Sequence, residues 1–259
     1  MAKRTVATIL GGAALAATVI AGGTPAQAGS WAVNAANRNG MVTNEYAYWN
    51  PTSRNSLHSP YWLMNSGSLF SRKVAGGPAF WTGRPDNKAP DARSTNGTNS
   101  AVFRMITRNA SFRNVTVGMS LNISGLTATS STPAVAWDGV HLFLRYQSEE
   151  SLYYATVARR DGAVVIKKKC RGGGSNGGTY YTLASTGGYR IPTNKWRFVQ
   201  ASAVTRGDGA VNLAVWVAGR RVSIATDNGI GCAAITKAGR TGVRGDNANF
   251  FFRSFRVRT

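Results

Sequence analysis

Residues 140–157 decide the fold of this chain, reading VHLFLRYQ at 140–147, SEES at 148–151 and LYYATV at 152–157. Two alternating runs around a short polar turn are typical of a β-hairpin. If Gln147 pairs with Leu152, Arg145 faces Tyr154 across the hairpin. Because side chains alternate between the two faces of a strand, one face is apolar and predicted to form core. That face carries Val140, Leu142, Leu144, Tyr146, Tyr153, Ala155 and Val157.

The other face of the hairpin carries side chains that can transfer protons or bind an anion. Its members are His141, Phe143, Arg145, Gln147, Tyr154 and Thr156. A third strand over residues 163–169 extends the pattern. It puts Val165, Lys167 and Lys169 on one face, and Val164, Ile166 and Lys168 on the other.

The same alternation continues over the remainder of the chain from about residue 100. Residues 101–106 and 115–121 alternate, and turn signals at 160–162, 207–209 and 218–220 separate apolar runs. No segment shows a helical stripe of useful length. The pattern predicts an all-β protein, a two-sheet jelly-roll sandwich. Residues 31–99 are irregular and rich in Trp, Asn and Gly, and we interpret them as opening strands and loops of a single domain over 29–259.

Residues 1–28 have the pattern of an export signal. Lys3 and Arg4 precede an uncharged run that reaches about residue 22, and residues 25–28 read PAQA. Small residues at this place suit signal peptidase, so we expect cleavage after Ala28 and a secreted, extracellular protein. The alternative of a membrane anchor is weak because Gly, Ala and Thr dilute the run, and no later stretch is apolar for long enough to span a bilayer.

The charge of the chain indicates its partners. It has 31 Lys and Arg against 10 Asp and Glu, a net charge of +21, and cleavage would remove two of the basic residues. Such a charge attracts polyanions, and outside a cell an acidic polysaccharide is the expected partner of a monomer. The alternative to a polyanionic partner is that the basic surface only keeps the protein soluble. Charge alone would also favour nonspecific binding of nucleic acid or an anionic membrane, and no specific nucleic-acid site is expected.

The two cysteines, Cys170 and Cys232, are expected to form one disulfide, because an even pair in an exported protein is usually bridged. Closing a loop of about sixty residues is worth roughly 4 kcal/mol in the chain-entropy model. Neither cysteine has a nucleophile or metal site around it.

Residues 143–147, 152–155 and 161–167, with the closing segments 196–199, 211–217 and 250–257, resemble the concanavalin-like (laminin-G-like) jelly-roll superfamily. The resemblance covers residues 100–259 well and the first third poorly. It implies two curved sheets with a glycan lying in a groove. Because this superfamily contains lectins, hydrolases and lyases, the fold alone does not choose an activity.

The acidic residues disfavour a glycosidase, which needs two carboxyl groups across the scissile bond. No strand carries two carboxylates at i and i+2 or i+4. Uronate β-elimination instead needs a base that removes the proton on the carbon beside the carboxylate. It also needs a cation that neutralises that carboxylate. The shared face of His141, Arg145 and Tyr154 resembles that of glucuronan and alginate lyases, although the Gln-x-His motif of alginate lyases is absent.

This resemblance implies a secreted polysaccharide lyase acting on a polyuronate. Tyr154 or His141 would be acid and base, and Arg145 and Gln147 would hold the carboxylate. Lys167 and Lys169 would line the substrate subsites. The alternation of residues 211–217 points Trp216 away from the apolar positions, so we expect its ring to stack on a sugar of the substrate. The alternative is a non-catalytic lectin-like or wall-binding module, in which His141 is only a satisfied sheet histidine.

No cofactor is expected to be required. With two histidines and paired thiols, a zinc site is disfavoured. A structural calcium ion near Asp138 or Asp246 is the one metal the sequence leaves open.

Overall fold

The computed structural model describes residues 29–259 except 45–53, 55, 86–97, 100 and 131. The expected export signal and Trp49 of the first third therefore lie outside the described residues. Within the described part there is no helix, and thus none long and apolar enough to cross a membrane.

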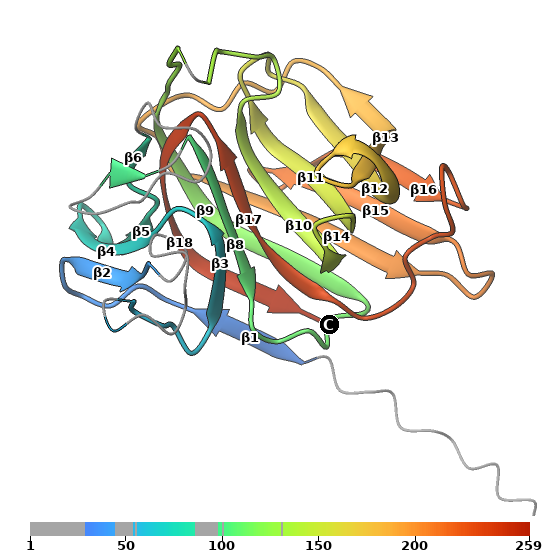
Figure 1. The fold of residues 1–259 in the computed structure, drawn as a ribbon, viewed down its shortest axis with the longest axis horizontal. Coiled ribbons are helices and arrows are strands. Elements are labelled where there is room, and N and C mark those ends of the chain that lie inside the picture. The colour runs from blue at the N-terminus through green and yellow to red at the C-terminus, as the bar shows by residue number, and fades with distance from the viewer. Residues whose placement is uncertain (1–28, 45–53, 55, 86–97, 100, 131) are drawn as a thin grey trace, which may run out of the picture.

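The described strands form two large antiparallel sheets and one short parallel pair (Figure 1). The nine-stranded sheet has the order β16-β15-β14-β9-β18-β5-β4-β2, with β1 beside β18. Its strands are β1 Ser30–Val33, β2 Gly40–Thr43, β4 Leu69–Val74, β5 Gly77–Trp81, β9 Val115–Leu126, β14 Arg197–Thr205, β15 Val211–Val217, β16 Arg220–Asp227 and β18 Ala248–Arg258.

The seven-stranded sheet lies in front of it in Figure 1, with the order β13-β12-β11-β10-β17-β8-β3. Its strands are β3 Trp62–Ser66, β8 Val102–Thr107, β10 Gly139–Ser148, β11 Ser151–Arg159, β12 Val164–Ser175, β13 Gly178–Thr186 and β17 Arg240–Asp246. The short pair is β6 Arg84–Pro85 with β7 Thr98–Asn99. The predicted all-β, two-sheet jelly-roll sandwich is confirmed.

The core fills the space between the two large sheets. Leu142, Leu144 and Tyr153 of the hairpin point into it and are fully buried. From the other sheet come Met119 of β9 and Phe252 of β18. Burying each such side chain contributes about 1.5–3 kcal/mol, so this interior supplies the main driving force for closing the sandwich.

A β-bulge in β10 makes part of the predicted hairpin register wrong. Ser148 pairs with Ser151 as expected, but Phe143, not Arg145, faces Tyr154. Between the pairs Leu144–Tyr153 and Ser148–Ser151, β10 has two residues more than β11, and Arg145 in this irregular stretch has a φ of +49°. The bulge exchanges two faces: Arg145 turns into the molecule, and Tyr146 packs outside with Phe143 and Tyr154.

Cys170 and Cys232 form the predicted disulfide, which joins β12 to the loop after β16. Beside it, Lys168 is fully buried and donates to Asp227 Oδ1 at 2.8 Å and to the Cys232 carbonyl at 2.5 Å. Tyr153 donates to the second Asp227 oxygen at 2.6 Å. Because both charges are paired and hydrogen-bonded, this buried cluster anchors the loop.

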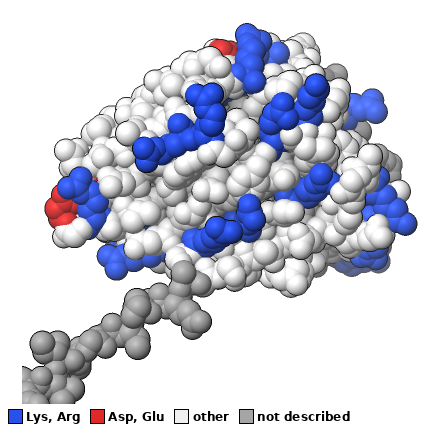
Figure 2. Space-filling view, turned by 180° about the vertical axis from the view of Figure 1, so that it is seen from behind, with Lys and Arg blue, Asp and Glu red and all other residues white. Residues whose placement is uncertain are grey.

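Lys and Arg are spread over the outer surface of the nine-stranded sheet, which faces the viewer in Figure 2. Asp and Glu appear only near the margin of that view.

Candidate functional site: a basic groove over the seven-stranded sheet

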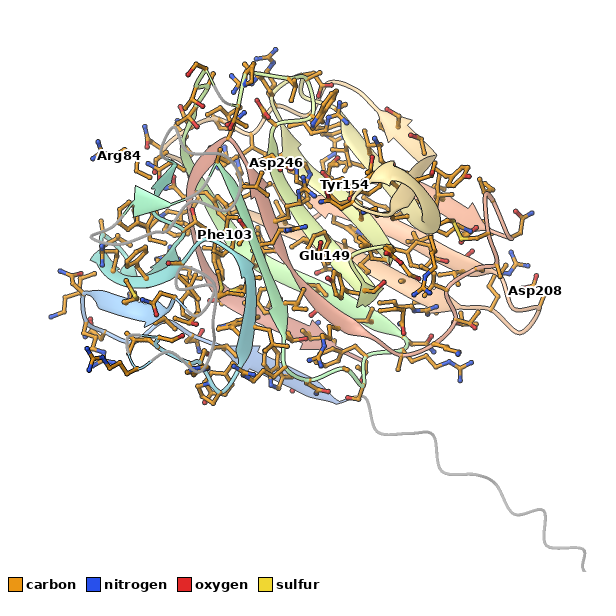
Figure 3. All side chains as sticks on the ribbon, in the orientation of Figure 1. Arg84, Phe103, Glu149, Tyr154, Asp208 and Asp246 are labelled. Atoms are coloured by element: carbon orange, nitrogen blue, oxygen red, sulfur yellow. A yellow bond between two sulfur atoms is a disulfide. The ribbon has the colours of Figure 1, made fainter. Side chains whose placement is uncertain are left out.

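A pocket of about 360 Å³ lies over β11, β12, β13 and β17 on the outer face of the seven-stranded sheet. Four cationic side chains line it, Arg159, Lys167, Lys169 and Arg244. None of the described lining residues is acidic. Figure 3 shows Tyr154 and Asp246 on this side of the sandwich. A pocket of this composition attracts an anionic ligand.

Period-two alternation places the two lysines in this groove. Lys167 is the cross-strand partner of Tyr154, and Lys169 is the partner of Tyr180 on β13. Their ammonium groups lie 5.9 and 5.1 Å from the centre of the Tyr180 ring. Burial lowers the pKa of both lysines. The predicted faces of the third strand are confirmed, because Lys168 points to the interior instead.

Tyr154 lies on the floor of the groove, and its ring stacks on the imidazole of His141. The ring centres are 4.5 Å apart and the planes differ by 23°. Burial raises the pKa of Tyr154 well above its usual value, so the phenol is protonated at every physiological pH. His141 itself is fully buried and does not line the pocket.

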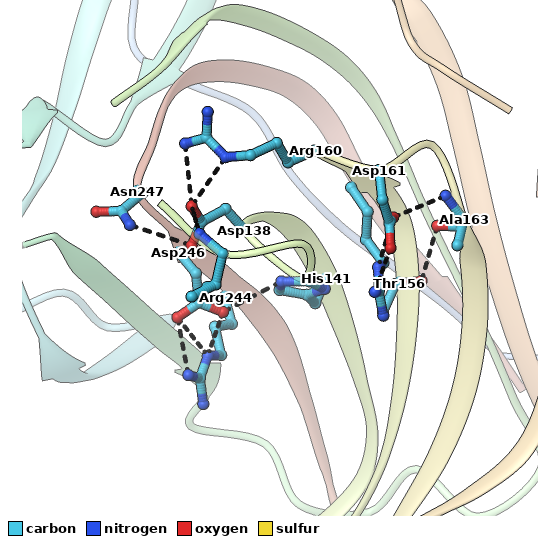
Figure 4. A network of polar contacts seen from close by, with 11 residues as sticks. Asp138, His141, Thr156, Arg160, Asp161, Ala163, Arg244, Asp246 and Asn247 are labelled. Carbon is cyan, nitrogen blue, oxygen red and sulfur yellow. Dashed lines mark hydrogen bonds and ion pairs between the residues drawn. The ribbon is translucent and has the colours of Figure 1, made fainter. Parts of the chain in front are cut away.

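Asp246 links His141 to Arg244 beneath the groove (Figure 4). His141 Nε2 lies 3.1 Å from Asp246 Oδ2, and Arg244 Nε donates to both Asp246 oxygens at 3.0 and 2.8 Å. Burial alone would raise the pKa of Asp246, but Arg244 and His141 outweigh it and hold that pKa far below its usual range. Burial lowers the pKa of His141 despite Asp246, so the imidazole is neutral. Arg244 is therefore a fixed cation held by a fixed anion.

Arg145 does not lie in the groove, and the prediction that it shares a face with His141 and Tyr154 is wrong. Its side chain is fully buried between the sheets. It donates to the carbonyls of Arg113 at 2.6 Å, Ile235 at 2.7 Å and Ala203 at 3.3 Å. Burial lowers the pKa of Arg145 to about 10, which still leaves it charged at neutral pH. It ties loops to the sandwich and cannot hold a substrate carboxylate.

Two further residues expected at the substrate lie elsewhere. Gln147 Nε2 donates to the carbonyls of Ala238 at 2.8 Å and Arg145 at 3.2 Å, at the end of β10 beyond the pocket lining. Trp216 belongs to β15 of the opposite sheet, where it pairs with Gln200 and Arg221. Placing Trp216 beside the groove residues was wrong, because its alternation faces it outward from the other sheet.

The groove also contains residues that the sequence did not single out. Arg244 and Tyr180 line it, and Trp137 stands at its edge with 53% of its surface exposed. The alternation of residues 240–246 could have revealed Arg244 once β17 was paired with β10, because Arg244 sits directly opposite His141. Gly174, Ser175 and Asn176 of the glycine-rich β12–β13 hairpin complete the lining.

No group of three or more His, Cys, Asp or Glu gathers within the described ranges as a metal site would require. Asp138, one of the two acids considered for calcium, accepts from Arg160 Nε at 3.0 Å and Asn247 Nδ2 at 3.1 Å, one on each oxygen. Both oxygens of Asp246 are likewise engaged. Structural calcium at either carboxylate stays a prediction, and these donors would compete with it.

The strand order and the two packed sheets make this chain an all-β, two-sheet jelly-roll sandwich. Neither a protein-family model nor a curated protein sequence matches it. A protein with a galectin-like fold from Bacillus subtilis is similar at 9% identity, with a TM-score of 0.48 over 76% of this chain and 88% of that one.

Two other solved structures have similar folds. An alginate lyase from Aplysia kurodai has 11% identity and a TM-score of 0.44 over 73% of this chain and 86% of its own. A legume lectin-like domain from Entamoeba histolytica has 9% identity and a TM-score of 0.43, over 76% and 88%.

Proposed function

We propose that this protein is a secreted lyase that binds a polyuronate in the basic groove and cleaves it by β-elimination. The observation that carries the proposal is the composition of the groove. It combines four cations, a protonated phenol and an exposed tryptophan with no acidic lining residue among those described. Such a set can bind an acidic chain and move protons on it, but it lacks the paired carboxyls of a glycosidase.

The first requirement of β-elimination is to neutralise the uronate carboxylate. Arg244 suits this role because Asp246 fixes its orientation and its side chain is still about one-fifth exposed toward the groove. A planar guanidinium held in this way can donate two parallel N–H bonds to a carboxylate. Withdrawing charge from the carboxylate makes the proton on the neighbouring carbon more acidic.

The second requirement is a base and an acid. Lys167, with a pKa lowered by burial, takes the proton from the carbon beside the carboxylate. The electron pair forms the new C=C bond, the glycosidic C–O bond breaks, and the phenol of Tyr154 gives its proton to the departing oxygen. The raised pKa of Tyr154 fits an acid and excludes a resting phenolate base.

His141 and Asp246 act through their neighbours as positioning residues. His141 supports the ring of Tyr154 from below, and Asp246 orients Arg244. Neither lines the pocket, so neither reaches the reacting atoms.

The proposal is tested by following ultraviolet absorbance during incubation with glucuronan, alginate, pectate, hyaluronan and heparin. Rising absorbance from an unsaturated uronate on one polymer supports it and names the substrate. A flat trace across the panel, with the protein shown to be folded, refutes the lyase.

The second candidate is a non-catalytic, lectin-like module that uses the same groove. The exposed Trp137 favours it, because an aromatic ring at the edge of a groove can stack on a sugar without any reaction. Saturable, salt-sensitive binding of one polymer without new chain ends would select this function.

A further inference from the structure

The nine-stranded sheet has a row of arginines on its outer face, opposite the groove. In β18, Phe252 points into the core and Arg253 points out. A bulge at Ser254, whose φ is +55°, then returns Phe255 to the core and leaves Arg256 outside. Both arginines therefore project from the same surface.

These side chains are held by aromatic rings. The guanidinium of Arg253 lies 4.1 Å from the centre of the Trp196 ring, and that of Arg256 lies 4.4 Å from the centre of the Phe198 ring. The guanidinium of Arg72 lies 4.6 Å from the centre of the Trp81 ring. We call Arg72, Arg253 and Arg256 the arginine face. A guanidinium held over a ring has already lost part of its side-chain entropy, so ordering it around a ligand costs less free energy.

No carboxylate of the described residues forms an ion pair with any member of the arginine face. The ion pairs of the described part involve other cations, such as Arg159, Lys168 and Arg244. The cross-strand neighbours of Arg253 and Arg256 are small residues of β9, Ser120 and Gly118 respectively. Figure 2 shows the resulting surface as basic with no acidic patch among its cations. These guanidiniums keep N–H donors for an external anion.

The groove and the arginine face share one recognition chemistry, a cation stacked on an aromatic ring. In the groove the pair is Lys169 over Tyr180, and on the opposite face it is Arg256 over Phe198. We propose that the arginine face binds a second stretch of the same acidic polysaccharide, so that one molecule holds the polymer at two places or bridges two chains. This inference rests on the proposed function for its ligand class.

A two-site protein binds a long chain more tightly than a short one, because the second contact becomes intramolecular. The test uses the Arg253→Gln/Arg256→Gln variant of the full mature chain. Its matched control, Arg206→Gln/Arg190→Gln, removes the same charge from two exposed arginines that are not members of the arginine face, of which Arg206 pairs with Asp208. Affinities are measured in a Tyr154→Phe background, in which we expect the polymer to be cleaved at least about a hundredfold more slowly.

For a polyuronate of about a hundred sugars, we expect the face variant to lose about tenfold in affinity and the control less than twofold. For a tetrasaccharide of the same polymer, both variants should bind as the parent does. With Tyr154 restored, the face variant should also cleave the tetrasaccharide at the parent rate. Equal loss on tetrasaccharide and polymer, or no loss on either, overturns the inference.

A variant of the groove separates failure here from failure of the proposed function. If Lys167→Gln/Lys169→Gln still binds the polymer and adding the face substitutions abolishes that binding, the arginine face is a site in its own right. If the face substitutions weaken binding to DNA or to anionic phospholipid vesicles but not to any polyuronate, the partner class is wrong. Thermal unfolding within a few degrees of the parent shows that each variant is folded, and Arg72→Gln provides an independent second variant of the face.

Discussion

The two groove lysines occupy similar places on one strand but have different neighbours. Lys167 stands opposite Tyr154, whereas Lys169 stands opposite Tyr180, two residues further along β12. If β-elimination occurs at Tyr154, the nearer lysine is the base and the further one binds the neighbouring sugar.

We therefore expect Lys167→Gln to lower kcat by at least about a hundredfold, the usual contribution of a positioned base. Lys169→Gln is the matched control and should mainly raise KM. Initial rates on the responsive polymer measure both. Equal effects of the two substitutions on kcat would contradict the assignment.

The pH dependence of the parent tests the same base. A lysine acts as a base only when neutral, so kcat/KM should rise with pH and level off below about 10.4, the ordinary lysine pKa. The lowered pKa of Lys167 gives the direction of this shift. A rate that already levels off below the ordinary histidine pKa of about 6.5 would instead point to His141, whose pKa is lowered by burial.

His141 makes stability depend on pH. Its folded pKa is depressed, so below about pH 6.5 the unfolded chain binds a proton that the folded protein does not. The stability contributed by the neutral imidazole is present above that pH and is lost as pH falls toward the folded pKa. We expect the free energy of unfolding to drop between pH 7 and 5, and His141→Phe to reduce that drop while keeping the stack on Tyr154. Urea titrations at each pH measure it, and identical slopes in both proteins would contradict the expectation.

At the scale of elements, alternation predicted most of the hairpin and failed at one residue. The core positions Leu142, Leu144 and Tyr153 follow from period two. Arg145 does not, because a bulge at a non-glycine residue with positive φ has no sequence signal. Its inward turn depends on the carbonyls of Arg113 and Ile235, which are distant in sequence and become neighbours only in the fold.

Because Arg145 is buried away from the groove, we expect its replacement to reduce stability and leave catalysis nearly unchanged. Arg145→Met should lower the free energy of unfolding by about 3 kcal/mol, because it leaves buried carbonyls without donors. The variant that remains folded should cleave polymer at nearly the parent rate. Denaturant unfolding and kinetics on the folded fraction test both parts. A loss of rate above tenfold would show that Arg145 takes part in catalysis.

Which sheet a strand joins is also hidden from periodicity. Trp216 alternates outward as predicted, but β15 pairs with β14 and β16 in the nine-stranded sheet. The groove belongs to the other sheet, so Trp216 and Lys167 lie on opposite faces of the sandwich. Only long-range pairing could have shown this, as it could have shown Arg244 beside His141.

At the scale of the whole molecule, the disulfide ties β12, a strand that lines the groove, to the loop after β16. Cys170 and Cys232 are 62 residues apart in the chain and join β12 to the loop that Lys168 also holds. We expect Cys170→Ser/Cys232→Ser to lower the free energy of unfolding by about 4 kcal/mol, the chain-entropy value for a loop of this size. Denaturant titration measures the loss, and a change under about 1 kcal/mol would show that the buried Lys168–Asp227 pair holds the loop alone.

The general architecture could be read from the chain because its strands are long, alternating and bounded by turns. The site could be read only in part. The residues on regular strands, Tyr154, Lys167 and Lys169, reach the groove as expected. Those whose positions depend on a bulge or on non-local pairing do not.

The central claim, elimination by Tyr154 in the groove, is tested most directly by the rate of absorbance increase on the responsive polyuronate for the parent and for Tyr154→Phe. The phenylalanine keeps the stack on His141 and removes only the hydroxyl. We predict that the rate falls by about a hundredfold or more while affinity for the polymer changes less than about threefold. An unchanged rate, or no absorbance increase from the parent on any polyuronate, would contradict the account.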